Sequence, residues 1–572
     1  PDTIRPTLKA LWERWTPAGR MDLEAAIRGL GESRATRVEV DRFDIDLQID
    51  DATERLHLQD GVIVLDRSSL ALEQIQIDAS IDTAGAGRFD HEDGLFGLDG
   101  LVTWNDDGTT VELACDLAEG RFQSPLLGSL LDAFVGGDFP DYWRDAEPSG
   151  QFAGQAELGL VPGGDWDWRL AVTPSTLSAT VRGERLSASI DHGRLLADNG
   201  VLRFDNLSFV MDAGDCRISG QLLTDTGLSG ELNFDFDGRI RSREVFALLP
   251  DEATDILSEI DFQDGMRTVL QDATLSFDLR PDSGAPWSLD TAVLFRGGSI
   301  DAGVEIDEVF GRADMHLASE PNRALEFSLR GDFDSFDVLG QRLTDSTLDM
   351  RLLDDGVRLA LQELSGDCAG GELAVTAMFD LGPRQLWSLR MQIADAALSR
   401  FMPVEPVEVD AEDSQSNDQR EDAVDGRVFI SANLLGSIGG GDRVGNGRVR
   451  IYEGELYQLP ITVGIYQLLQ LSTPFINSPE FVDVVWHLDG EDIELEQIQL
   501  LSLDGDRVTF SLNGEGTFDW DAKSISAVLR PRSSWLVLAD VFGALQDRFY
   551  AVGVEGPVSS PEVELISFPD LQ

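Results

Sequence analysis

The sequence predicts a mainly β protein, an antiparallel meander of strands with a few short amphipathic helices. Three observations support this fold class. Apolar and acidic residues alternate with period two in many segments, Gly- and Asp-containing turn signals recur about every ten residues, and a longer pattern of strands repeats along the chain. Period two places one set of side chains on each face of a sheet, so each strand has one apolar and one polar face.

The first clear strand runs from Val38, where Phe43, Ile45, Leu47 and Ile49 alternate with Asp44, Asp46, Gln48 and Asp50. The same alternation recurs along the chain. Its apolar positions are Ile75 and Ile77; Leu232, Phe234 and Phe236; Leu325, Phe327 and Leu329; Leu348, Met350 and Leu352; and Val508, Phe510 and Leu512. Strands of this kind need a partner for their apolar face, which can be a second sheet, helices or lipid chains.

A longer repeat of strand, Gly-Asp turn, strand, turn and strand is centred near Asp215, Asp367 and Asp506. The three copies lie 152 and 139 positions apart, and a fainter copy covers residues 83–117. Self-similarity of this kind predicts a repeat architecture.

Short amphipathic helices are predicted directly after the third strand of several modules. Their apolar stripes are Leu126, Leu127, Leu130, Leu131 and Phe134; Val245, Phe246, Leu248 and Leu249; Leu398, Phe401 and Met402; and Leu538, Val541, Phe542 and Leu545. Such a helix either plugs the open end of a sheet or forms a lid or membrane-facing element at the mouth of a groove.

Composition divides the chain into three parts. Residues 403–425 are acidic, polar and poor in apolar residues, which predicts a disordered linker or loop. Residues 1–402 before it carry the repeating β modules, and residues 426–572 form a C-terminal region.

Asp and Glu number 104 against 44 Lys and Arg, a formal net charge of −60. This charge excludes nucleic acid as a partner and keeps the surface soluble. The three cysteines are far apart and the five histidines are scattered, so we expect no disulfide framework, metal site or cofactor. Motifs such as Asp235-Phe236-Asp237 fit solvent-facing strand residues better than calcium ligands, although calcium stays an alternative.

The stretch from Gly447 to Trp520 carries the most specific pattern. It combines a strand, a Gly turn at Gly454, an apolar helix with Ile465, Leu468 and Leu469, and strands broken at Asp489-Gly490, Asp504-Gly505 and Asn513-Gly514; Gly553-Val554-Glu555-Gly556-Pro557 follows. This rhythm resembles the C-terminal region of the AsmA-like family of bacterial envelope proteins, which are related in architecture to TamB and to bridge-like lipid transfer proteins.

The resemblance implies an elongated, strongly bent antiparallel sheet that forms a repeating apolar groove. Its lining consists of the alternating apolar residues named above other than Phe43, seventeen in all. It implies that the groove carries phospholipid acyl chains between the inner and outer membranes, with both membranes engaged through segments or partners outside this chain. It also implies a periplasmic location and an N-terminal inner-membrane anchor preceding Pro1.

The leading hypothesis is therefore non-enzymatic lipid transport without catalytic residues. The first alternative is an envelope scaffold or outer-membrane assembly factor whose β cores are closed, which the same alternation would produce. An enzyme on a parallel β-solenoid would need a period of roughly 20 to 30 residues, and the sequence shows no such period.

Overall fold

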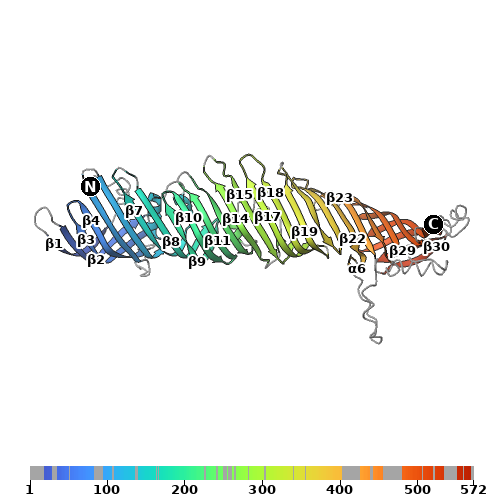
Figure 1. Ribbon diagram of the computed structural model, residues 1–572, viewed down its shortest axis with the longest axis horizontal. Helices are drawn as coiled ribbons and strands as arrows, with labels where there is room; N and C mark the ends of the chain where they lie inside the picture. Colours follow the sequence, from blue (N-terminus) through green and yellow to red (C-terminus); the bar gives the residue numbers. More distant parts are fainter. Residues whose placement is uncertain are drawn as a thin grey trace, which may run out of the picture. The chain divides into compact units, whose positions relative to one another are not determined.

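The structure is a computed structural model in which one antiparallel sheet dominates the fold (Figure 1). It describes residues 18–28, 35–49, 52–82, 95–105, 108–134, 139–162, 164, 166–224, 227–239, 243–248, 254, 261–262, 266–280, 283–301, 305–338, 340–353, 356–401, 426–437, 442–454, 480–504, 507–519, 522–533, 550–557 and 560–567. Within these residues the sheet contains thirty strands, and the helices are few and short. The predicted mainly β, antiparallel fold class is confirmed.

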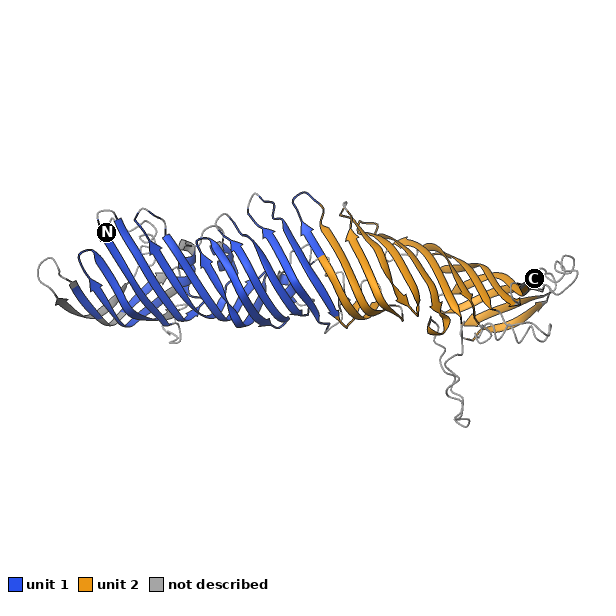
Figure 2. Ribbon diagram, in the orientation of Figure 1, with its two compact units in different colours: residues 1–295, 316–323 blue, residues 296–315, 324–572 orange. Residues whose placement is uncertain are grey.

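The chain divides into two compact units, residues 1–295 with 316–323 and residues 296–315 with 324–572 (Figure 2). Unit 1 contains β1 (Ala18–Arg28), β2 (Ala35–Ile49), β3 (Ala52–Leu65), β4 (Ser69–Asp82), β5 (Leu95–Asn105), β6 (Gly108–Arg121), β7 (Ser149–Leu160), β8 (Trp166–Val181), β9 (Glu184–Asp198), β10 (Val201–Met211), β11 (Gly214–Leu223), β12 (Ser229–Gly238), β13 (Asp261–Phe262), β14 (Thr268–Asp278) and most of β15 (Trp287–Arg296). Its helices are α2 (Pro125–Phe134), α3 (Phe139–Asp145) and α4 (Arg243–Leu248).

Unit 2 contains β16 (Ile300–Asp301), most of β17 (Glu305–Ser319), β18 (Glu326–Val338), β19 (Gln341–Leu352), β20 (Arg358–Cys368), β21 (Gly371–Asp380), β22 (Leu386–Ala397), β23 (Arg427–Ser437), β24 (Val444–Tyr452), β25 (Phe481–Asp489), β26 (Asp492–Asp504), β27 (Arg507–Asp519), β28 (Ser524–Ser533), β29 (Tyr550–Pro557) and β30 (Glu562–Ser567). One helix, α6 (Leu398–Phe401), follows β22.

Two-residue turns join several neighbouring strands. Asn199 and Gly200 connect β9 to β10 with φ of 37° and 85°. Positive φ at both positions defines the type I′ hairpin turn, which Asn-Gly adopts readily and whose twist matches that of the strands. Such turns keep each strand beside its neighbour in sequence.

Two of the three turns predicted in the C-terminal region are correct. β25 ends at Asp489 and β26 ends at Asp504, as their Asp-Gly dipeptides predict. The third prediction is wrong, because Asn513 and Gly514 lie within β27. A Cβ atom at Gly514 would lie 2.1 Å from the carbonyl oxygen of Val528, so close packing against β28 favours glycine inside the strand.

The predicted helices near residues 126–134, 245–248 and 398–401 are confirmed as α2, α4 and α6. The predicted helices at Ile465–Leu469 and Leu538–Leu545, and the acidic segment 403–425, lie outside the described residues. No helix in the described part of the chain is both long and apolar enough to cross a membrane.

Candidate functional site

The register of unit 1 lines up apolar residues across consecutive strands. Residues directly opposite in an antiparallel pair lie on the same face. From β3 to β15, one residue on each of twelve strands lies directly opposite the next one on the adjacent strand, and we call this line of residues the unit-1 apolar row. It consists of Leu58, Ile77, Phe96, Leu117, Gly154, Val172, Leu195, Phe204, Gly220, Leu232, Leu275 and Leu289. Every member is apolar or glycine, so unit 1 has a continuous apolar face.

Unit 2 has an equivalent line from β18 to β29. The unit-2 apolar row consists of Leu329, Met350, Leu361, Ala377, Leu389, Leu434, Gly445, Leu488, Ile493, Phe518, Ile525 and Gly556. On β21–β29, a residue directly next to each row member along the strand lies on the opposite face, and these residues are polar throughout. This polar row consists of Thr376, Arg390, Asn433, Asn446, His487, Glu494, Thr517, Ser526, Glu555 and Glu562.

Most members of the two apolar rows are only half-buried. In unit 1, Leu58, Val172 and Leu289 are buried and the other nine are intermediate; in unit 2, Ala377 alone is buried. The inner faces of a closed β-sandwich interdigitate into a packed core. The rows therefore have the exposure of an apolar surface that is partly open.

The predicted lining residues of unit 1 lie on this face. Opposite pairs join Ile45 to Leu56 on β3, and Ile75 to Leu98 on β5, while Ile77 and Leu232 belong to the row itself. Leu47, Ile75 and Phe236 are buried, whereas Ile45, Ile77, Leu232 and Phe234 are half-buried. Ile49 is the last residue of β2, and its side chain lies outside the described part of the structure.

The predicted residues of unit 2 divide into two groups. Leu325, just before β18, and Phe327, Leu329, Leu348, Met350 and Leu352 on β18 and β19 are half-buried, and Leu329 pairs with Met350. Phe510 and Leu512 are buried. Val508 is 43% exposed, and a register shift between β26 and β27 separates it from Phe510.

Phe510 and Leu512 belong to a closed cluster at β26–β29. Its buried members are Leu495, Ile498, Leu500, Phe510, Leu512, Ala527, Leu529, Val552 and Val554. The register connects them to the face of the unit-2 apolar row, since Leu500 lies opposite Leu512 and Ala527 opposite Val554. The apolar face is therefore buried at these strands, whereas the members of the unit-2 apolar row on β18–β25 are half-buried except for Ala377.

Sequence reasoning missed the rows' small residues and several strands between β5 and β11. Gly154, Gly220 and Gly445 interrupt the apolar alternation, so their strands carry a weaker pattern. The signal that would have found them is cross-strand pairing, since each lies opposite a bulky partner such as Val172, Leu232 or Leu434.

Helix α2 lies on the apolar face of unit 1 and is anchored by a buried carboxylate. Glu54, only 1% exposed, lies opposite Leu47 and accepts hydrogen bonds from the Leu126 N–H (2.9 Å) and the Ser124 hydroxyl (3.0 Å). A carboxylate is favourable at a helix N-terminus, where backbone N–H groups are otherwise unpaired. Leu127 of α2 then packs against Phe122 and Phe152.

A buried ion pair fixes the polar face of unit 2. Asp483, 3% exposed, accepts a hydrogen bond from Arg448 Nε at 2.5 Å and lies 3.5 Å from Arg450 Nε. The hydrogen bond from Arg448 holds the pKa of Asp483 below its usual range, so the carboxylate remains ionised. Within the described residues, no three His, Cys, Asp or Glu side chains form a group that could hold a metal ion.

Two cysteines on the apolar face provide a test of its local environment. Burial, reinforced by Asp116, raises the pKa of Cys115 to about 11, and burial with Asp235 raises the pKa of Cys216 to about 12, from 9.0. Only the thiolate reacts, so at pH 8 we expect alkylation roughly 100-fold (Cys115) and roughly 1,000-fold (Cys216) slower than in the unfolded chain. Rates measured by mass spectrometry should rise with pH; rapid labelling at pH 8 would contradict the assigned environment.

The chain matches no protein-family model, no curated protein and no solved structure. The site must therefore be interpreted from its own geometry. That geometry is one long apolar row in each unit, backed in unit 2 by the polar row, and it is suited to holding apolar chains.

Proposed function

We propose that the protein carries phospholipid acyl chains along the apolar face of its sheet, as a non-enzymatic lipid transport protein of the bacterial cell envelope. The observation that carries the proposal is the half-buried state of both apolar rows. The resemblance to AsmA-like proteins supports the envelope location, the periplasmic setting and the link to inner and outer membranes.

The energetics of the rows suit a lipid path. An acyl chain in water costs about 0.8 kcal/mol per CH₂ group, and an apolar surface removes much of that cost wherever the chain touches it. Because the rows are continuous, a sliding chain meets a similar environment at each strand. The polar row and the excess of acidic residues keep the opposite face hydrated.

The length of the rows predicts more than one lipid per chain. At about 4.8 Å per strand, a row of twelve strands extends roughly 53 Å. One leaflet contributes about half of the roughly 30 Å hydrocarbon core of a bilayer. Each row is thus about three times longer than one extended acyl layer, so several lipids can lie along it.

A matched pair of variants on β12 tests the proposal. Phe234 is half-buried on the apolar face, and Asn233 is its exposed neighbour on the opposite face. Phe234→Asp places a charge among the acyl chains, whereas Asn233→Asp adds the same charge where Thr274 already donates a hydrogen bond. By native mass spectrometry we expect several phospholipids on the wild-type chain and on Asn233→Asp, and a loss of half or more in Phe234→Asp.

A folded, lipid-free wild-type chain from a lipid-rich source would overturn the proposal. The second candidate, a scaffold with closed β cores, would then be favoured. The closed cluster at β26–β29 is the observation that supports it. Equal lipid content in both variants would also argue against binding on the apolar face.

A further inference from the structure

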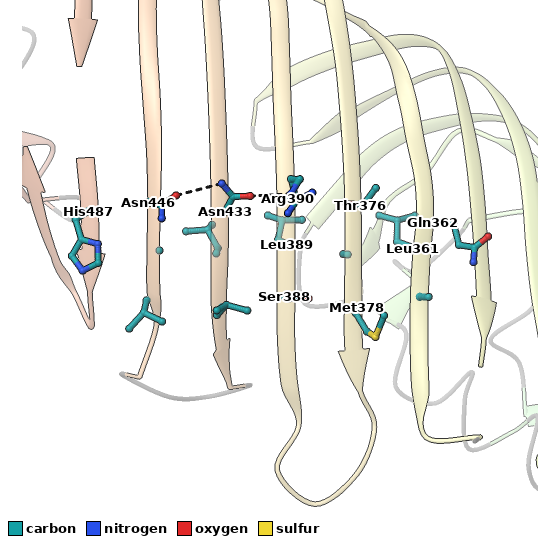
Figure 3. Close-up of a pocket in the computed structure, with 16 residues that line it drawn as sticks. Leu361, Gln362, Thr376, Met378, Ser388, Leu389, Arg390, Asn433, Asn446 and His487 are labelled. Atoms are coloured by element: carbon teal, nitrogen blue, oxygen red, sulfur yellow. Dashed lines mark hydrogen bonds between the residues drawn. The ribbon is translucent and has the colours of Figure 1, made fainter. Parts of the chain in front are cut away.

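Two adjoining hollows lie over the unit-2 apolar row. The larger, of about 900 Å³, spans β20–β25 and is lined on most of these strands by three consecutive residues (Figure 3). The middle residues are members of the row, namely Leu361, Ala377, Leu389, Leu434 and Gly445. The smaller hollow, of about 390 Å³, is centred in the same way on Val375, Met391 and Ala432. The apolar face over these strands therefore offers a volume in the range of small-molecule binding sites.

Hydrogen bonds on the opposite face hold together the strands that form the larger hollow. Arg390 Nε donates to Asn433 Oδ1 at 3.0 Å, and Asn433 Nδ2 donates to Asn446 Oδ1 at 3.3 Å (Figure 3). These side chains link β22, β23 and β24, which also pair through their backbones. The floor of the hollow is therefore fixed by two sets of hydrogen bonds.

The apolar face next to the hollow is closed on one side. From β26 to β29 this face carries the closed cluster, and the row members Ile493, Phe518 and Ile525 pack against that cluster. To move further along the row, a lipid chain in the hollow has to displace packed side chains, which loses packing contacts and forces unfavourable rotamers. Movement along the row is therefore expected to end at the hollow, and a lipid there needs another way out.

A strip of apolar pairs leads from the hollow to the rim of the sheet, the side where β20 begins and β21 ends. Residues two positions apart along a strand lie on the same face. Counted outward from the row, the pairs are Leu361 with Ala377, Leu359 with Phe379, and Val357 with Leu381. At the last pair, just outside the strands, the Leu381 N–H donates to the Val357 carbonyl at 2.7 Å and continues the register. The strip is therefore continuous with the row.

Exposure along the strip increases toward the rim. Ala377 is buried and Phe379 is half-buried, whereas Leu381 is 56% exposed and its partner Val357 is 41% exposed. A single exposed leucine is common on protein surfaces and needs no explanation. Leu381 and Val357 differ because they form the outer end of a continuous apolar path, so an acyl chain keeps apolar contact from the hollow to the rim.

Unit 1 contains the same arrangement on β12 and β14. Counted outward from its row, the pairs are Leu232 with Leu275, Gly230 with Phe277, and Leu228 with Leu279. The Leu279 N–H donates to the Leu228 carbonyl at 2.7 Å, and Leu279 is 39% exposed. In both units Phe-Asp-Leu-x-Pro precedes Trp-Ser-Leu, at residues 277–281 with 287–289 and residues 379–383 with 387–389. The exposed leucine is therefore part of a repeated sequence element.

We propose that the rim at Val357 and Leu381 is a lateral port through which phospholipid acyl chains enter and leave the unit-2 apolar row. Leu228 and Leu279 form its counterpart in unit 1. The proposal rests on the lipid transport proposed above and adds the place of exchange. Acyl chains follow the strip between rim and row while the polar headgroup stays at the rim, in water. Exchange at the rim lets a lipid leave unit 2 without crossing the closed cluster.

Two double variants of the full chain test the ports. Leu279→Asp with Leu381→Asp places a charge at the outer end of both strips. Leu223→Asp with Leu435→Asp is the matched control, because Leu223 is 47% exposed, Leu435 is 54% exposed, and the register places both on the opposite face near the same rims. All four positions are exposed, so both variants should fold, and circular dichroism checks this.

Rate and equilibrium are measured separately. Phosphatidylcholine vesicles that contain a fluorescent phospholipid and a quencher unable to leave the vesicle report the rate of lipid transfer to the chain, and native mass spectrometry gives the lipid content at equilibrium. We expect the port variant to slow transfer roughly ten-fold, because acyl chains then pass a charge in place of an apolar contact, with lipid content unchanged. The control variant should match wild type. Leu279→Met with Leu381→Met keeps apolar side chains of similar volume and should also match wild type.

The outcomes separate the ports from lipid binding itself. If the wild-type chain carries phospholipid but the port variant transfers it as fast as wild type, or both double variants slow transfer equally, the ports are overturned and lipid transport stands. A lower equilibrium content in the port variant would mean that the two leucines belong to the binding surface, which also contradicts a port. A wild-type chain without lipid would overturn both proposals.

Discussion

Leu512→Asp is expected to unfold the strands β26–β29, with a loss of at least about 4 kcal/mol of local stability. Leu512 is 0% exposed and lies within the closed cluster of nine buried residues. Truncation to alanine at such a site costs about 2–5 kcal/mol, and an unpaired buried carboxylate costs more. The expected signature is rapid hydrogen exchange over residues 492–557, while β2–β12 keep their protection.

The matched control is Asn513→Asp, on the next residue of the same strand. Asn513 points to the opposite face, where Arg530 is its register partner across β28. The added charge therefore faces an arginine, and the change should stay within about 0.5 kcal/mol. Equal exchange in the two variants would mean that the cluster at β26–β29 is not a packed core.

This expectation also refines which apolar residues can report on lipid binding. Phe510 and Leu512 belong to the same period-two pattern as Phe234 and Phe327, so the sequence gives all four the same assignment. Only the structure separates the two buried residues from the two half-buried ones. Substitutions at Phe510 would report on folding, whereas those at Phe234 and Phe327 would report on the open part of the face.

Alternation with period two was enough to predict the fold class and one face of most strands. The side chain at each position is placed by local geometry, so Ile45, Leu232 and Leu329 could be assigned from the sequence alone. Register is different, because it depends on pairing between distant residues and on bulges such as the one that separates Val508 from Phe510. The glycines of the rows were missed for the same reason.

The polar face was the least predictable part. Arg390, Asn433 and Asn446 are far apart in sequence, and no spacing rule relates them. They come together only because β22, β23 and β24 pair in one register. Likewise, the sequence shows Glu54 only as an acidic residue in a strand. Its role depends on the segment after β6, which places the N–H of Leu126, 72 positions away in sequence, within hydrogen-bond distance of its carboxylate.

Glu54→Ala is expected to release α2 from the apolar face of unit 1. The substitution removes the acceptor of the Leu126 N–H and of the Ser124 hydroxyl, both part-buried. Losing charge-assisted hydrogen bonds of this kind costs about 3 kcal/mol, which corresponds to a roughly hundredfold increase in local opening. Hydrogen exchange over residues 125–134 measures it. Glu54→Gln keeps one acceptor oxygen and should show about a third of the effect.

The same pair of variants decides between a plug and a lid, the two roles that the amphipathic stripe of α2 allows. Leu127 of α2 packs against Phe122 and Phe152, beside Val172 of the unit-1 apolar row, so the helix covers area that lipid would otherwise occupy. If α2 is a lid, opening it exposes that area, and we expect Glu54→Ala to carry more phospholipid than wild type in native mass spectra. If α2 is a structural plug, exchange increases while lipid content stays the same or falls. Comparing lipid content with exchange in the same preparations separates the two roles, because only a lid links an open helix to added lipid.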